Sequence, residues 1–88
     1  MRLRFDSNSA TEDGRYWLWL PGTERDLKAL GVELEEGMAV TLCMDDADED
    51  GHPSLLLVDA VVERDGGRFV ARADERTWRH ESVRDGAV

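Results

Sequence analysis

Residues 55–73, LLLVDAVVERDGGRFVARA, decide the fold of this chain. Along 55–63 alternate residues are apolar, which is the period of a strand with a buried face. The inward-facing residues of that strand are Leu56, Val58, Ala60 and Val62. Asp65-Gly66-Gly67 follows, and a hairpin turn of this kind needs the positive φ that glycine adopts without strain. The stretch therefore predicts two antiparallel strands, at 55–63 and 68–73, joined by a tight turn.

Short alternating segments on both sides of this hairpin predict the remaining strands, at 2–5, 15–20, 37–44 and 77–82. The segments 2–5 and 15–20 are expected to form an antiparallel hairpin with a long polar connection. One helix is expected at 23–30, with Thr23 as its N-cap, Asp26 three residues later as in a capping box, and Gly31 at its end. We therefore expect a mainly β fold of about five or six antiparallel strands with one short helix.

Residues 36–82 carry a regular succession of strand and turn signals. Glu36-Gly37-Met38 opens a strand, a variable polar loop follows, Gly66-Gly67 turns the next hairpin, and a brief turn leads into a last strand that carries Trp78. In this order the segment 36–82 resembles an SH3-like small β-barrel. The resemblance implies binding of peptides, nucleic acids or other proteins through loops and aromatic residues, although a fold alone does not fix a function. The domain is expected to span 1–83, with a flexible tail at 84–88.

The chain is strongly acidic, with a formal net charge of −9. Five of the six residues at 45–50 are acidic, so their removal alone would bring the charge from −9 to −4. Nucleic acid is not expected as a partner, because binding to phosphates requires clusters of Lys and Arg. No apolar run approaches the ~18 residues of a membrane span. The N-terminal residues have no apolar signal segment, so we expect no membrane partner and a cytoplasmic location.

The acidic segment begins like the calcium-binding loop of an EF-hand. The first ligand positions and the glycine at position 6 are matched by Asp46, Asp48, Asp50 and Gly51. Position 12 falls on Leu57, which cannot ligate a cation, and the flanking segments are predicted strands rather than helices. A solvated hairpin connection is therefore the favoured interpretation, with a partner-binding loop and a calcium site completed from elsewhere as alternatives. We expect no metal and no cofactor.

The aromatic residues of 15–20 are the second candidate feature. Trp17 and Trp19 alternate with apolar residues and would share one face of a strand. A core role or a self-association interface is favoured for them over a platform for a ligand, since a small domain needs large side chains to bury area. Cys43 is interpreted as a buried apolar residue, and a nucleophilic pair with His80 is not favoured because no orienting group is evident. The chain is not expected to be an enzyme.

These features together predict a small acidic, non-catalytic binding module that acts through protein–protein contacts. The expected partner is a protein of unknown identity, basic if the acidic segment steers it, and the chain is expected to be a monomer or a homodimer. Two alternatives stay open: an acidic inhibitor or nucleic-acid mimic that neutralises a basic protein, and a structural homodimer subunit. The candidate binding residues are Trp17, Trp19, Asp45, Asp46, Asp48, Glu49 and Asp50.

Overall fold

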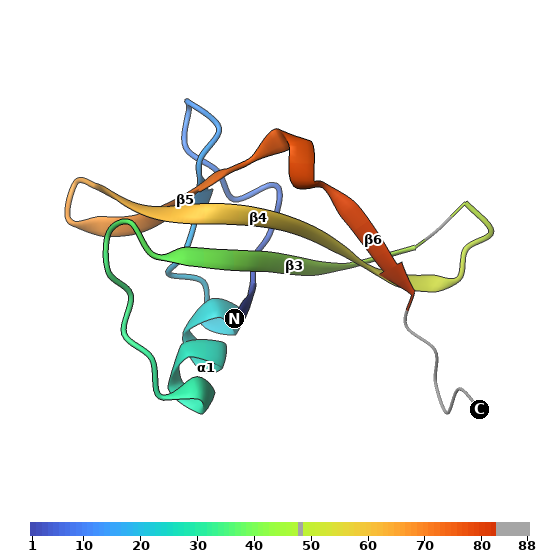
Figure 1. Ribbon diagram of the computed structural model, residues 1–88, viewed down its shortest axis with the longest axis horizontal. Helices are drawn as coiled ribbons and strands as arrows, with labels where there is room; N and C mark the ends of the chain where they lie inside the picture. The colour runs from blue at the N-terminus through green and yellow to red at the C-terminus, as the bar shows by residue number, and fades with distance from the viewer. Residues whose placement is uncertain (48, 83–88) are drawn as a thin grey trace.

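The computed structural model describes residues 1–47 and 49–82 (Figure 1). The elements follow in the order β1 (Arg2–Arg4), β2 (Tyr16–Trp17), α1 (Pro21–Leu30), β3 (Ala39–Ala47), β4 (Pro53–Asp65), β5 (Arg68–Ala73), the 3-10 turn η1 (Glu75–Thr77) and β6 (Arg79–Ser82). The prediction of a mainly β fold with about six strands and one short helix is confirmed for this part of the chain. The expected tail at 84–88 and Asp48 lie outside the described residues. Within the described ranges, no helix is long and apolar enough to cross a membrane.

The long strand β4 organises the sheet. One edge of β4 pairs with β3, and its other edge is shared between β6 at the Pro53 end and β5 at the Asp65 end (Figure 1). Between these two partners, the amide of Asp74 donates to the Asp59 carbonyl at 2.8 Å, and the Asp59 amide donates to Thr77 Oγ1 at 2.9 Å. The turn η1 therefore pairs the backbone groups of β4 at the point where one neighbouring strand replaces the other.

The predicted hairpin between the first two strand segments is wrong. β1 instead pairs in parallel with β3, and the strand order β1-β3-β4-β5-β2 places β1 and β2 at opposite ends of the path. The parallel register sets Leu3 beside Leu42, and both side chains are fully buried. The pairing buries both leucines on the core face, and the short range 2–5 carries no signal for which strand would lie beside it or in which direction.

The start of the helix also differs from the prediction. α1 begins at Pro21 after an N-cap at Leu20, and proline suits the first helical position because it has no amide hydrogen to leave unpaired. Thr23 is therefore not the N-cap: it is fully buried in the first turn, and its hydroxyl donates to the carbonyl of Arg4. The amide of Arg4 in turn donates to Asp26 Oδ2 at 2.8 Å. Thr23 and Asp26, expected to cap the helix, thus form hydrogen bonds with backbone groups of Arg4 at the open edge of β1 rather than with the first amides of α1.

The core lies on one face of the sheet and ends in an aromatic cluster. Its buried members are Leu3, Phe5, Leu18, Val40, Leu42, Val58, Ala60, Val62 and Ala71. Phe5 packs edge-on against Tyr16 at 5.0 Å between ring centroids, and Trp78 lies 6.2 Å from each of these two rings. Three segments that are distant in sequence therefore meet in this cluster, where Trp78 packs half-buried against the core.

Candidate functional site

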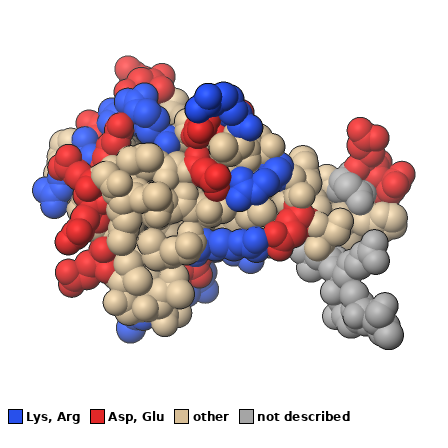
Figure 2. Space-filling view, in the orientation of Figure 1, with Lys and Arg blue, Asp and Glu red and all other residues tan. Residues whose placement is uncertain are grey.

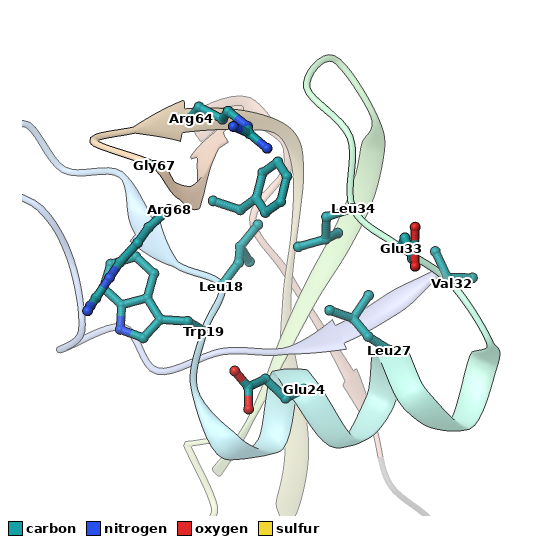
Figure 3. Close-up of a pocket in the computed structure, with 11 residues that line it drawn as sticks. Leu18, Trp19, Glu24, Leu27, Val32, Glu33, Leu34, Arg64, Gly67 and Arg68 are labelled. Atoms are coloured by element: carbon teal, nitrogen blue, oxygen red, sulfur yellow. The ribbon is translucent and has the colours of Figure 1, made fainter.

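A groove of about 790 Å³ separates α1 and the segment that follows it from the β4–β5 hairpin (Figure 3). Its apolar lining residues are Leu18, Leu27, Val32, Leu34 and Phe69. Its remaining lining residues are Trp19, Glu24, Glu33, Arg64, Gly67 and Arg68. The groove therefore combines an apolar floor with an aromatic ring and charged groups of both signs.

Local backbone signals hold the helix side of the groove in place. Gly31 ends α1 in the left-handed conformation, with φ of 67°, as the sequence predicted. The amide of Val32 donates back to the carbonyl of Leu27 at 3.1 Å, which turns the chain toward the sheet. The amide of Gly37 then donates to the Val62 carbonyl at 2.8 Å. Leu34 lies between the residues that form these two hydrogen bonds, and it packs against the core.

The hairpin side of the groove carries two arginines, each placed over an aromatic ring. Gly66 and Gly67 have φ of 60° and 86°, which confirms the predicted tight turn. The guanidinium carbon of Arg64 lies 4.8 Å from the centroid of Phe69, its cross-strand neighbour. The guanidinium carbon of Arg68 lies 4.8 Å from the centroid of Trp19. Each contact is a cation–π interaction, worth about 0.5–1 kcal/mol at an exposed site.

The two sides of the groove differ in charge. Both arginines come from the β4–β5 hairpin, whereas Glu24 comes from α1 and Glu33 from the segment after it (Figure 3). A ligand in the groove would therefore meet positive charge on the hairpin side and negative charge on the helix side. This polarity can orient an occupant, not only retain it.

Trp17 and Trp19 share a face, as predicted, but neither belongs to the core. Their rings stack with centroids 4.9 Å apart and an angle of 17° between planes, and both side chains are half-buried. The core cluster and its packed neighbours include Tyr16 and Leu18 on the other face of this segment. The core interpretation of the two tryptophans is therefore wrong, and Trp19 instead forms part of the groove.

The acidic segment lies far from the groove. Asp45 and Asp46 belong to β3 rather than to a loop, since the β3–β4 pairing continues as far as Ala47 opposite Pro53. Trp19 contacts Arg68 beyond the other end of β4, a strand of 13 residues. At about 3.3 Å per residue, such a strand spans roughly 40 Å. The tryptophans and the acidic residues, predicted as one binding surface, are therefore separate.

Two of the predicted acidic residues already have partners within the protein. Asp45 Oδ2 lies 3.0 Å from Arg4 Nη1, and Asp46 Oδ2 lies 2.9 Å from His80 Nε2. Glu49 is exposed in the connection between β3 and β4. Within residues 1–47 and 49–82, no group of three or more His, Cys, Asp or Glu side chains is arranged to hold a metal ion.

The acidic side chains do not form one continuous surface on the face shown in Figure 2. They lie near the β4–β5 turn, at the tip of the β3–β4 hairpin and at places between these ends, where Lys and Arg side chains are interspersed with them. This distribution differs from an unbroken acidic stripe, which is the arrangement that a nucleic-acid mimic needs.

Cys43 and His80 face opposite sides of the sheet. Register places Met44, Leu56 and His80 in line across β3, β4 and β6, and Cys43 is adjacent to Met44 along its strand. Neighbouring residues on a strand point to opposite faces, so the thiol and the imidazole cannot meet. Burial also raises the pKa of the Cys43 thiol, which disfavours the thiolate.

The contact between Asp46 and His80 predicts a dependence of stability on acid. The hydrogen bond from His80 and one from the Ala47 amide lower the pKa of Asp46 below its ordinary 3.8. A lowered folded-state pKa contributes stability above the unfolded value, and this contribution is lost as the pH falls through the folded value. Asp46→Asn should therefore be less stable than the wild type at pH 6, and the difference should shrink as the pH is lowered toward about 2.

Urea unfolding at the two pH values measures this difference. Glu49→Gln, at the exposed tip of the same hairpin, is the matched control and should follow the wild type at both. A deficit of Asp46→Asn that is the same size at pH 6 and in acid would show that the carboxylate charge is not its origin.

Sequence reasoning missed the groove because its lining comes from three separate segments. The available signal was local: Arg64 and Arg68 flank the predicted Gly66-Gly67 turn. Nothing in the alternation of apolar residues indicates that the helix would face this turn. A comparison of the chain with protein-family models, with curated proteins and with solved structures finds no match in any of the three.

Proposed function

We propose that this protein is a small non-catalytic binding module that holds an apolar side chain of a partner protein in the groove between α1 and the β4–β5 hairpin. The observation that carries the proposal is the apolar floor of the groove, which lies open beside the half-buried ring of Trp19. Its volume of about 790 Å³ falls in the range of ligand sites, which are typically about 300–1,000 Å³. Aromatic side chains at such positions commonly supply much of the binding energy of an interface.

Two other functions have weaker support. An acidic inhibitor or mimic would use the acidic side chains, but Asp45 and Asp46 pair within the protein, and on the visible face the acidic groups are interrupted by Lys and Arg (Figure 2). A structural homodimer would use the second hollow, of about 450 Å³, where Met1 and Val61 are exposed. Most of the remaining lining of that hollow is polar, which suits a self-associating surface less well.

Titration with N-acetyl-phenylalanine amide, followed by amide chemical shifts, tests the proposal. The probe is neutral, so it reports on the apolar floor alone. Saturable shifts are expected at Leu34, Gly67 and Phe69, which line the groove. Trp19→Ala should weaken binding about tenfold, as expected when an aromatic anchor is removed.

Leu30→Ala is the control for this titration, because Leu30 is a large exposed hydrophobic residue outside the groove and should leave binding unchanged. Shifts confined to the hollow around Met1 and Val61, or shifts that do not saturate, would contradict the assignment of the groove as the binding site.

A further inference from the structure

We infer that the groove selects an acidic peptide segment of the partner, in which a side-chain carboxylate lies next to the apolar side chain that fills the groove. This inference rests on the proposed function and specifies the chemistry of the partner. It departs from the sequence-based expectation of a basic partner, because the acidic segment and the groove lie at different ends of β4.

Arg68 is the first observation that carries the inference. Most arginines of the described residues are paired: six lie 2.6–3.1 Å from a carboxylate oxygen, namely Arg2, Arg4, Arg15, Arg72, Arg76 and Arg79. Arg68 lines the groove and rests on the ring of Trp19, and no carboxylate of the described residues lies within ion-pair distance of it. The guanidinium charge of Arg68 is therefore available to pair with an anion of a ligand in the groove.

Arg64 gives the groove a second cationic group of the same kind. Its guanidinium rests on Phe69, and its ion pair with Glu36 is long, at 3.7 Å between Nε and Oε1. Both side chains of that pair are more than half exposed. An exposed ion pair of this length is weak, so it competes little with a carboxylate that approaches from the groove.

The stacking on aromatic rings leaves the arginines able to bind an anion. A cation–π contact uses the face of the guanidinium plane, whereas the five N–H donors lie in that plane and point outward. A carboxylate accepts two such hydrogen bonds side by side. An apolar side chain in contact with Trp19 or Phe69 has a guanidinium as its immediate neighbour, so a carboxylate one residue away in the peptide is within reach.

The glutamates of the groove determine which side the carboxylate takes. Glu24 and Glu33 repel an anion from the helix side, so the acidic residue of the peptide is directed toward the hairpin. The net charge of −9 opposes long-range attraction of an acidic peptide, so the preference arises from direct contact. The titrations should be carried out at about 0.15 M salt, because the Debye length is then about 8 Å and the charges distant from the groove are screened.

Three capped dipeptides test the inference on the full chain: acetyl-Glu-Phe-amide, acetyl-Gln-Phe-amide and acetyl-Lys-Phe-amide. They share the apolar group and differ in charge. The Glu peptide is expected to bind the wild type about tenfold more tightly than the Gln peptide, as for hydrogen bonds between charged groups. The Lys peptide is expected to bind no more tightly than the Gln peptide.

The double variant Arg64→Gln, Arg68→Gln should reduce the preference for Glu over Gln to less than twofold while the Gln peptide still binds. Arg25→Gln is the matched control. Arg25 lies on α1 outside the groove and, among the described residues, has the Pro21 carbonyl as its hydrogen-bond partner and no paired carboxylate. This control should keep the full preference, because it changes the net charge without changing the groove.

The outcomes separate this inference from the proposed function. Equal binding of the Glu and Gln peptides to the wild type would overturn the acidic preference and leave the apolar groove in place. Tighter binding of the Lys peptide would also overturn it and would restore a basic partner. Failure of all three peptides to give saturable shifts in the groove would overturn the proposed function itself, and this inference with it.

Discussion

Replacement of Leu42 by alanine should lower the free energy of unfolding by about 3 kcal/mol. Leu42 is fully buried in the middle of β3, with Leu3 of β1 on one side and Val58 of β4 on the other. The truncation removes apolar contact area and leaves a cavity among three strands that cannot easily close. Because small domains have total stabilities of only about 5 kcal/mol, about 2 kcal/mol should remain, and the ratio of unfolded to folded protein should rise by roughly a hundredfold.

Urea unfolding of Leu42→Ala, followed by tryptophan fluorescence, measures this loss. Leu30→Ala is the matched control, since the same chemical change at the exposed end of α1 should alter stability by less than about 0.5 kcal/mol. Comparable losses in the two variants would mean that the face of β3 that carries Leu42 is not the core.

Replacement of Thr23 by valine should cost about 2 kcal/mol, although the two side chains have nearly the same shape. The hydroxyl of Thr23 donates to the carbonyl of Arg4, and Thr23 is fully buried. Valine would leave that carbonyl without its donor in a part-buried contact at the open edge of β1, and removal of one partner of such a hydrogen bond costs about 1–3 kcal/mol. Thermal or urea unfolding gives the difference directly.

Two further substitutions distinguish this role from helix capping. Thr23→Ser keeps a hydroxyl donor and should retain most of the stability. Thr23→Asp would be favourable at an N-cap, because a carboxylate accepts hydrogen bonds from the first helical amides. At a buried position facing the Arg4 carbonyl the ionised carboxylate cannot donate, so Thr23→Asp should be at least as unstable as Thr23→Val. A stable aspartate variant would restore Thr23 as the helix cap.

The β4–β5 hairpin shows how far local patterns could predict this structure. Alternation along 55–63 identified the buried residues Val58, Ala60 and Val62, whereas Leu56, also expected to face inward, is half-buried and Leu57 on the opposite face is buried. The Gly66-Gly67 turn has the positive φ values that the sequence required. These features depend on residues that are adjacent or two apart, so the sequence contains the whole signal. The same holds for Gly31, whose left-handed conformation ends the helix.

The partners of β1 and Thr23 could not be predicted in the same way. The alternation along 2–5 places Leu3 and Phe5, both buried in the structure, on one face of a strand, but it contains no information about which strand would lie beside them. Thr23 and Asp26 have the spacing of a capping box, and the same two side chains also fit the backbone of a neighbouring strand. Only the position of α1 against β1 decides between these uses.

For the candidate site, too, some features could be predicted from the sequence and others could not. The sequence by itself determined that Trp17 and Trp19 share a face, that acidic charge is concentrated at 45–50, and that two arginines flank a tight turn. The tertiary structure alone decided that Trp19 and Arg68 meet beside α1 and that the acidic segment lies at the other end of β4. The physical reason is that strand period and turn conformation are set by neighbouring residues. Contacts between distant segments depend instead on which packing buries the most apolar surface while every buried backbone group finds a partner.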